Sequence, residues 1–142
     1  MKKLLLLLLV SLLTAPVVVV DAQTTAPAPK AAAQKTVKPV EVYYFHYTRR
    51  CATCQAVEIE TQKAIAALYP AQFKAGKIIF KSLNLDNATS KPFADKCKAE
   101  GQSLLIISGN KRIDLTDQAF MYANSKPEKL KAEIKNVIDK MM

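Results

Sequence analysis

The sequence predicts an α/β domain in which helices cover both faces of a central mixed four-stranded sheet. Runs rich in β-branched and aromatic residues alternate with amphipathic runs, in the order strand, helix, strand, helix, strand, strand, helix. A helix joins the first two strands, so these strands should be parallel. Two residues, Gly109 and Asn110, join the last two strands, which predicts an antiparallel hairpin.

The first strand and the first helix are the clearest elements. The segment "VEVYYFHYT", residues 40–48, is dense in residues that favour buried strands. From Cys51 to Leu68 the apolar period changes to three and four residues, which predicts a helix with one apolar face, and Pro70 should stop it. The residues of that face are Cys54, Val57, Thr61, Ala64, Ile65 and Leu68.

The second strand is predicted over residues 77–85, "KIIFKSLNL", and a second helix follows it. Ser90 should cap this helix, Pro92 suits its first turn, and Gly101 should end it.

The last part of the domain is predicted to form a hairpin and a closing helix. The runs "SLLIIS" and "KRIDL" are the two hairpin strands. The segment "KPEKLKAEIKNVIDKMM" should be an amphipathic helix with a stripe of apolar residues, Leu130, Ile134, Val137, Ile138 and Met141.

The N-terminus has the layout of a secretory signal. Two lysines precede an apolar run, and small residues stand before Gln23, so we expect a signal peptide over residues 1–22; retention as a membrane anchor is the alternative. Residues 23–39 are rich in Ala, Pro, Thr and Lys and predict a flexible linker. Residues 40–142 form the folded domain. We therefore expect an exported, periplasmic protein.

The charge is strongly basic, with a formal value of +9, but the lysines are scattered along the domain. A scattered basic surface, together with export, argues against a nucleic-acid partner. It favours a solvated monomer with at most a loose association with anionic membrane.

Two of the three cysteines, Cys51 and Cys54, stand two residues apart at the start of the first helix. Unpaired N–H groups at a helix start favour an anion such as thiolate, and Arg49 and Arg50 add positive charge beside the pair. Both effects lower a thiol pKa. Cys51 should be exposed and nucleophilic, while Cys54, deeper in the helix, should be the resolving thiol.

Other chemistry remains open for the pair. Structural zinc usually needs four ligands, and the chain offers only Cys97 and His46 in addition. Haem attachment needs a histidine where Gln55 stands. A structural disulfide would close too short a loop to constrain the chain much. Two thiolates could also hold a soft ion, with Met141 and Met142 as further sulfur donors.

Three further residues stand near the pair or share its chemistry. His46 lies in the first strand, where a packed histidine is the default and a proton-handling role is the alternative. Cys97 should be a buried core residue, because it follows Phe93 by one helical turn. Tyr47 could frame the site.

The chain from Val40 to Met142 resembles the thioredoxin fold in its element order and in the place of its cysteines. More narrowly, "VYYFHYTRRCATCQAVE" and the later "GQSLLII" resemble the ArsF family of small exported proteins, which is described as a nitrophenyl compound nitroreductase subunit. The resemblance implies thiol–disulfide exchange by a redox-active Cys51–Cys54 disulfide. No flavin is expected, because no Gly-rich phosphate loop is present.

The chain departs from the thioredoxin pattern at two places. Thioredoxins carry a cis-proline just before the third core strand, where this chain has Gly101, Gln102 and Ser103; they also carry a buried acid where this chain has Phe45. Ser103 could instead offer a hydroxyl near the sulfurs.

The sequence thus predicts an exported thiol–disulfide oxidoreductase that needs no cofactor. Its partner would be a protein or a small molecule carrying a thiol or disulfide. The alternative is a thiol-based carrier or sensor of arsenite or copper(I) without disulfide turnover.

Overall fold

A computed structural model of the chain describes residues 38–142. The predicted signal peptide and linker residues 23–37 lie outside the described residues. None of the helices within residues 38–142 is long and apolar enough to cross a membrane.

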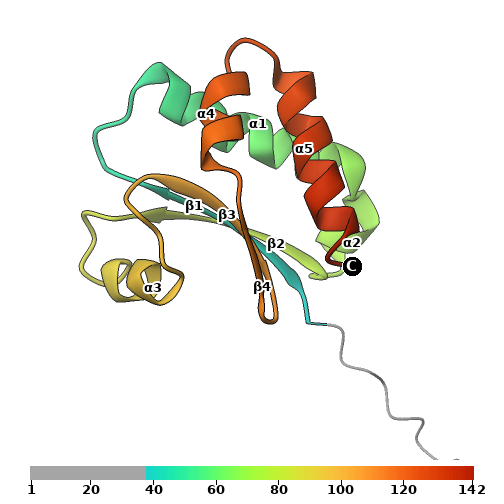
Figure 1. Ribbon diagram of the computed structural model, residues 1–142, viewed down its shortest axis with the longest axis horizontal. Coiled ribbons are helices and arrows are strands. Elements are labelled where there is room, and N and C mark those ends of the chain that lie inside the picture. Colours follow the sequence, from blue (N-terminus) through green and yellow to red (C-terminus); the bar gives the residue numbers. More distant parts are fainter. Residues whose placement is uncertain (1–37) are drawn as a thin grey trace, which may run out of the picture. The chain divides into compact units, whose positions relative to one another are not determined.

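The sheet has the strand order β2-β1-β3-β4 and is mixed, as the sequence predicts (Figure 1). Its strands are β1 (Val40–His46), β2 (Ile78–Asn84), β3 (Ser103–Ser108) and β4 (Lys111–Asp114). β1 is central: it pairs in parallel with β2 and antiparallel with β3. The antiparallel pairing brings the start of β3 to the end of β1, where the cysteine turn begins.

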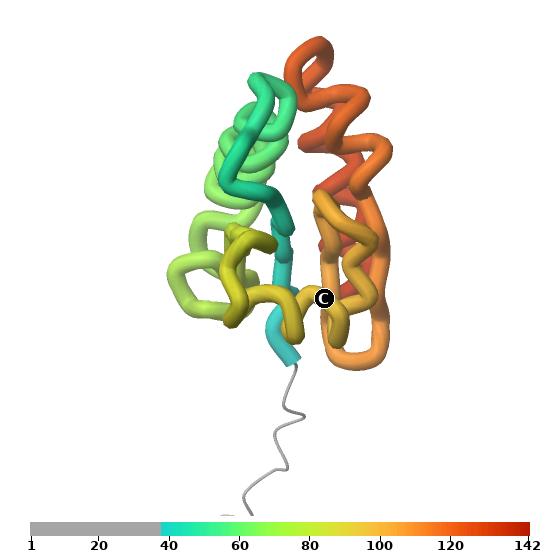
Figure 2. Tube along the Cα trace, turned by 90° about the vertical axis from the view of Figure 1, so that its left-hand side faces the viewer, coloured from blue at the N-terminus to red at the C-terminus, as the bar shows by residue number. Residues whose placement is uncertain are grey.

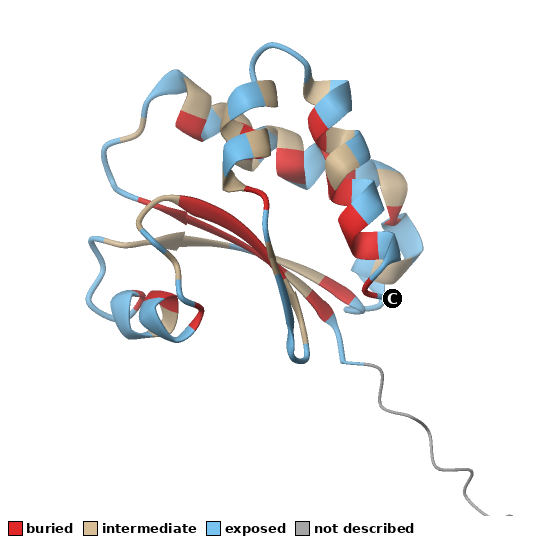
Figure 3. Cartoon of the chain, viewed as in Figure 1, coloured by how far each residue is buried: buried red, intermediate tan, exposed pale blue. Residues whose placement is uncertain are grey.

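The larger core lies between one face of the sheet and α1 (Ala52–Leu68), α4 (Thr116–Tyr122) and α5 (Pro127–Asp139). The predicted stripe of the closing helix is buried there in full, and Figure 3 shows buried (red) segments at intervals along α5. The sheet contributes alternate residues of β1, as a strand must when both its faces are covered. Among them are Val42 and Tyr44, both fully buried.

The smaller core lies on the other face, under α3 (Lys91–Lys96). Tyr43 and Phe45 of β1 point to this face and pack with Ala94, Cys97 and Leu105. The Tyr43 and Phe93 rings meet edge to face, with their centroids 5.0 Å apart. Helices therefore cover both faces, and Cys97 is the buried core residue that was predicted.

Pro70 stops α1 as predicted, whereas two predictions about the ends of α3 were wrong. Pro70 ends α1 but also begins a short helix, α2 (Pro70–Lys74), since proline fits the first helical turn. Ser90 precedes α3 but makes no side-chain capping hydrogen bond. α3 ends at Lys96, well before Gly101.

Two backbone positions have positive φ where a turn requires it. Gly109, with φ of +60°, opens the predicted hairpin turn, as in a type II′ turn. Lys98, with φ of +55°, takes the left-handed position just after α3.

Candidate functional site

The cysteine pair lies where the chain leaves β1 and enters α1. In Figure 2, β1 (cyan) runs through the middle of the domain, and the chain turns at its upper end into α1. Cys51 is the N-cap of α1 and Cys54 lies in its first turn. Their sulfur atoms lie at disulfide-bonding distance, and their Cα atoms are 5.1 Å apart, within the usual range for a disulfide.

The two sulfurs have different surroundings. Cys51 is exposed, whereas Cys54 is 4% exposed and belongs to the buried face of α1. The backbone N–H of Cys54 points at Sγ of Cys51, at an N···S distance of 3.2 Å. Cys51 is thus accessible to a partner and receives a helix N-terminal donor, while Cys54 is shielded beneath it.

Gln102, which sequence reasoning did not select, is in contact with the pair. Its Oε1 lies 3.3 Å from Sγ of Cys54, within hydrogen-bond distance for a thiol donor. It reaches this place because Ser103, the first residue of β3, pairs with Phe45 near the end of β1.

Ser103 lies next to Gln102 at the start of β3. Its hydroxyl is buried and donates to the carbonyl oxygen of Gly101 at 3.2 Å. The observed contact to Cys54 comes from the neighbouring Gln102, which precedes β3 and is not bound to the alternation of side chains within a strand.

Three side-chain hydrogen bonds hold the turn in place. The side chain of Asp86 accepts from the backbone N–H of Thr48 at 2.7 Å, and the Asn84 amide donates to the Thr48 hydroxyl at 2.8 Å. Between the two cysteines, the Thr53 hydroxyl accepts from the Asn124 amide at 2.8 Å. The cysteine turn is therefore tied both to the end of β2 and to the segment that follows α4.

Tyr44 anchors the first turn of α1 from below. Its hydroxyl donates to the carbonyl oxygen of Cys54 at 2.8 Å in the buried core. Burial raises the pKa of Tyr44 to about 12, with Arg50 opposing this shift and Glu58 adding to it. The hydroxyl therefore keeps its proton at ordinary pH and stays a donor.

The two arginines next to the pair differ. Arg49 is exposed, and Arg50 forms an ion pair with Glu58. Burial acts to raise the pKa of Glu58, but the hydrogen bond and the charge of Arg50 outweigh it and the pKa is lowered. The carboxylate of Glu58, one helical turn after Cys54, therefore offsets the positive charge that Arg50 brings to the site.

His46 is buried at the end of β1. Its Nδ1 lies 2.9 Å from the carbonyl oxygen of Tyr47, so Nδ1 carries the proton and donates. His46 is therefore packed in the strand, which is the first of the two interpretations that the sequence suggested. Tyr47 itself is 41% exposed, and its hydroxyl lies beside Gly101: a Cβ added to that glycine would be 3.7 Å from the hydroxyl oxygen.

The other sulfur atoms do not join the pair. Cys97 belongs to the smaller core under α3, and Met141 is buried in the larger core. Met142 lies with Val40 and Lys77 at the start of β1, the end opposite to the cysteine turn. Within residues 38–142, no group of three or more His, Cys, Asp or Glu side chains is placed to hold a metal ion.

Comparisons with known proteins give no family. No family model matches the chain, and no curated protein matches it. Among solved structures, the chain is similar to one described as "Structure of a malarial protein", with 17% sequence identity and a TM-score of 0.40. The match covers 62% of this chain and 96% of that chain, and a likeness this weak carries no argument about function.

Proposed function

We propose that this protein is an exported thiol–disulfide oxidoreductase of the thioredoxin-like class, related to the ArsF family. The observation that carries the proposal is the asymmetric cysteine pair at the start of α1. An exposed sulfur that receives a helix N-terminal N–H suits an attacking thiolate, and a shielded sulfur at bonding distance suits a resolving thiol.

The exchange begins from the reduced protein. The Cys51 thiolate attacks one sulfur of a partner disulfide, forms a mixed disulfide and releases the partner's other sulfur, which takes up a proton. Cys54 then gives up its proton and attacks Sγ of Cys51. The mixed disulfide breaks, the second partner thiol leaves, and the Cys51–Cys54 disulfide forms while the partner gains two electrons. The same steps in reverse oxidise a partner dithiol.

The contacts of the pair divide the two roles. The Cys54 N–H favours the thiolate of Cys51, because a charge-assisted hydrogen bond is stronger than a neutral one. The side-chain oxygen Oε1 of Gln102 lies 3.3 Å from Sγ of Cys54, so on reduction it would accept from the Cys54 thiol and favour the protonated form until the resolving step. Arg49 supports the thiolate by charge, and Arg50 does so less, because Glu58 pairs with it.

Trapping of the mixed disulfide tests the proposal. The Cys54→Ser protein should accumulate a covalent adduct with a disulfide-bonded substrate such as insulin or a glutathione-capped peptide. The matched Cys51→Ser protein should not, and the unaltered chain should turn the substrate over. Equal adduct formation by both single variants, or none by either, would refute the assignment of the two roles.

Titration of the reduced chain with copper(I) or arsenite distinguishes the carrier hypothesis from the oxidoreductase hypothesis. Tight stoichiometric binding together with absent disulfide turnover would favour the carrier. The sulfurs of Cys51 and Cys54 would then be its ligands, since within residues 38–142 neither Met141 nor Cys97 lies beside them.

A further inference from the structure

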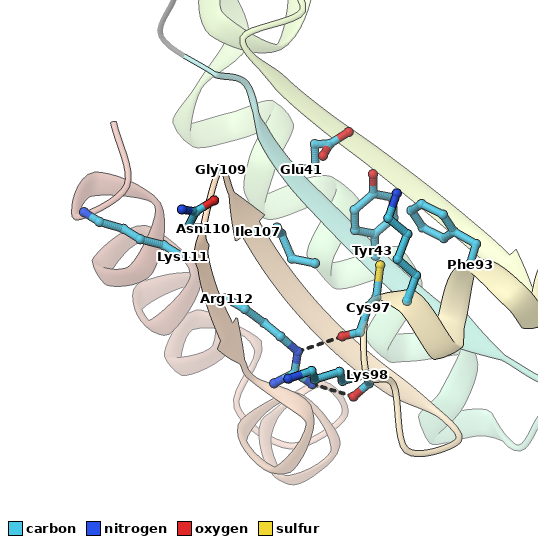
Figure 4. Close-up of a pocket in the computed structure, with 11 residues that line it drawn as sticks. Glu41, Tyr43, Phe93, Cys97, Lys98, Ile107, Gly109, Asn110, Lys111 and Arg112 are labelled. Carbon is cyan, nitrogen blue, oxygen red and sulfur yellow. Dashed lines mark hydrogen bonds between the residues drawn. The ribbon is translucent and has the colours of Figure 1, made fainter.

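A second candidate site lies on the opposite face of the sheet, between α3 and the β3–β4 hairpin. It is a cavity of about 410 Å³, a volume in the range of small-molecule sites. Its apolar floor is formed by Tyr43, Phe93, Cys97 and Ile107, and Figure 4 shows these side chains converging from β1, α3 and β3. None of the residues of the cysteine site lines it.

The rim of this cavity is strongly cationic. Four cations, Lys96, Lys98, Lys111 and Arg112, line it with the single carboxylate of Glu41. That carboxylate already lies 4.0 Å from the amine of Lys81. Within residues 38–142, Lys96 and Lys98 have no carboxylate partner, so the cavity keeps an excess of positive charge above an aromatic floor.

Arg112 gives the rim a fixed geometry. Its Nε donates to the carbonyl oxygen of Cys97, and one terminal nitrogen donates to the carbonyl oxygen of Lys98, both at 2.9 Å. Figure 4 shows both bonds. The same nitrogen also contacts Asp114 at 3.1 Å. Because the guanidinium is held on three sides, the segment after α3 is fixed against the hairpin.

Lys98 stands where a glycine would be expected. The N–H of Ala99 bonds to the carbonyl oxygen of Ala94 at 2.9 Å across the end of α3, and Lys98 in between has φ of +55°. Helix ends of this type usually place glycine at that position, since a side chain there is strained. A lysine in this position destabilises the fold, and its side chain lines the cavity. Strained residues of this kind gather at functional sites.

From these observations we infer that the cavity under α3 binds an organic anion with an apolar body, such as an aromatic or aliphatic carboxylate. The aromatic floor takes the apolar body, and Lys96 and Lys98 take the anionic group. The same chemistry occurs in a free acid and in an anionic membrane lipid, and the experiment distinguishes these sources.

Fluorescence titration of the full chain with anilinonaphthalene sulfonate tests the inference. We expect saturable binding of one dye per chain, displaced by naphthoate or decanoate. Lys98→Gly should weaken dye binding roughly two- to fivefold, the effect of losing one exposed ionic contact. The same variant should raise the melting temperature by roughly 4 °C, because glycine relieves the left-handed strain.

Two control variants make the result specific. Lys74→Gln removes the same charge from α2 and should leave dye binding unchanged. Cys51→Ser should also bind the dye normally, so failure here and failure of the proposed redox function are distinguishable. Backbone amide NMR shifts on adding naphthoate should be confined to Tyr43, Ile107 and the segment after α3.

Some outcomes would overturn the inference. One is non-saturable dye binding; another is equal weakening by Lys98→Gly and Lys74→Gln, which would show only a general charge effect. Changes in NMR shift at residues outside the cavity would also contradict binding at this site. Binding to phosphatidylglycerol vesicles without binding of free decanoate would instead identify a lipid as the source of the anion, and displacement of the dye by decanoate alone would identify the free acid. Binding of neither ligand would overturn the inference.

Discussion

Replacing Gln102 by leucine should make the cysteine pair more reducing. In the structure Oε1 of Gln102 lies 3.3 Å from Sγ of Cys54, so we expect the Cys54 thiol to donate to this oxygen once the pair is reduced. The disulfide has no S–H to donate, so the contact stabilises the reduced form more than the oxidised form. Leucine keeps much of the side-chain volume but removes the acceptor, and the reduction potential should fall.

The size of the shift follows from the hydrogen bond. A neutral hydrogen bond in a folded protein contributes about 0.5–1.5 kcal/mol. For a two-electron couple, ~1.4 kcal/mol corresponds to about 30 mV. Loss of the Gln102 contact should therefore lower the potential by roughly 10–30 mV.

The assay is equilibration of the pair with glutathione or dithiothreitol buffers, followed by quantitative alkylation of the free thiols. Gln118→Leu is a matched control, because Gln118 lines the neighbouring cavity beside Gln102 but makes no hydrogen bond to either sulfur. A Gln102→Leu potential that stays unchanged or rises would refute the reasoning, as would an equal fall in Gln118→Leu.

Three other predictions concern Cys51, Tyr44 and Gly109. The rate of Cys51 alkylation in the reduced chain should reach its plateau below pH ~8.5, the ordinary thiol value, and a rate still climbing beyond it would contradict thiolate stabilisation. Tyr44→Phe should lower the free energy of unfolding at pH 7 by about 1 kcal/mol, measured by urea unfolding, because the hydrogen bond to the Cys54 carbonyl is lost. Because the pKa of Tyr44 is raised in the folded state, the neutral hydroxyl contributes to the free energy of unfolding below pH ~10, and this contribution is lost as the pH rises to about 12. The free energy of unfolding should therefore fall by roughly 2–3 kcal/mol over this range in the unaltered chain and by less in Tyr44→Phe. An equal fall in both proteins would contradict the assignment to Tyr44. Gly109→Ala should destabilise the domain by about 1 kcal/mol in thermal unfolding, because φ there is +60°, whereas Asn110→Ala should have a smaller effect.

The sheet could be predicted from sequence because its signals are local. Runs of β-branched, aromatic or other apolar residues marked β1, β2 and β3, and the joining helix required that β1 and β2 be parallel. Gly109-Asn110 marked the hairpin and with it β4. The apolar stripe of α5 was also complete. In each case the local sequence pattern favoured the same element that packing in the sheet or the core requires.

The short helices could not be predicted in the same way. α4 has a single buried residue, Ala119, which gives no stripe to detect. α2 has none, and its first residue, Pro70, was interpreted only as a stop. Helices this short depend on tertiary packing more than on their own propensity.

The site was predictable at the level of the cysteines but not of their partners. The position of Cys51 and Cys54 at a helix start determined which sulfur is exposed. The contact from Gln102 depends on the register between β1 and β3, and the pairing of Arg50 depends on a rotamer. The spacing of residues along the chain predicts neither of these two contacts.

The unequal cores have a consequence for motion. The layer under α3 is held by few apolar side chains, whereas the opposite layer joins three helices to the sheet. Segments with few buried contacts open at lower free energy than the rest of a domain. Amide protons of residues 91–99 should therefore exchange with deuterium earlier than those of α1 or α5, so this layer can detach briefly while the scaffold carrying the two sulfurs stays intact.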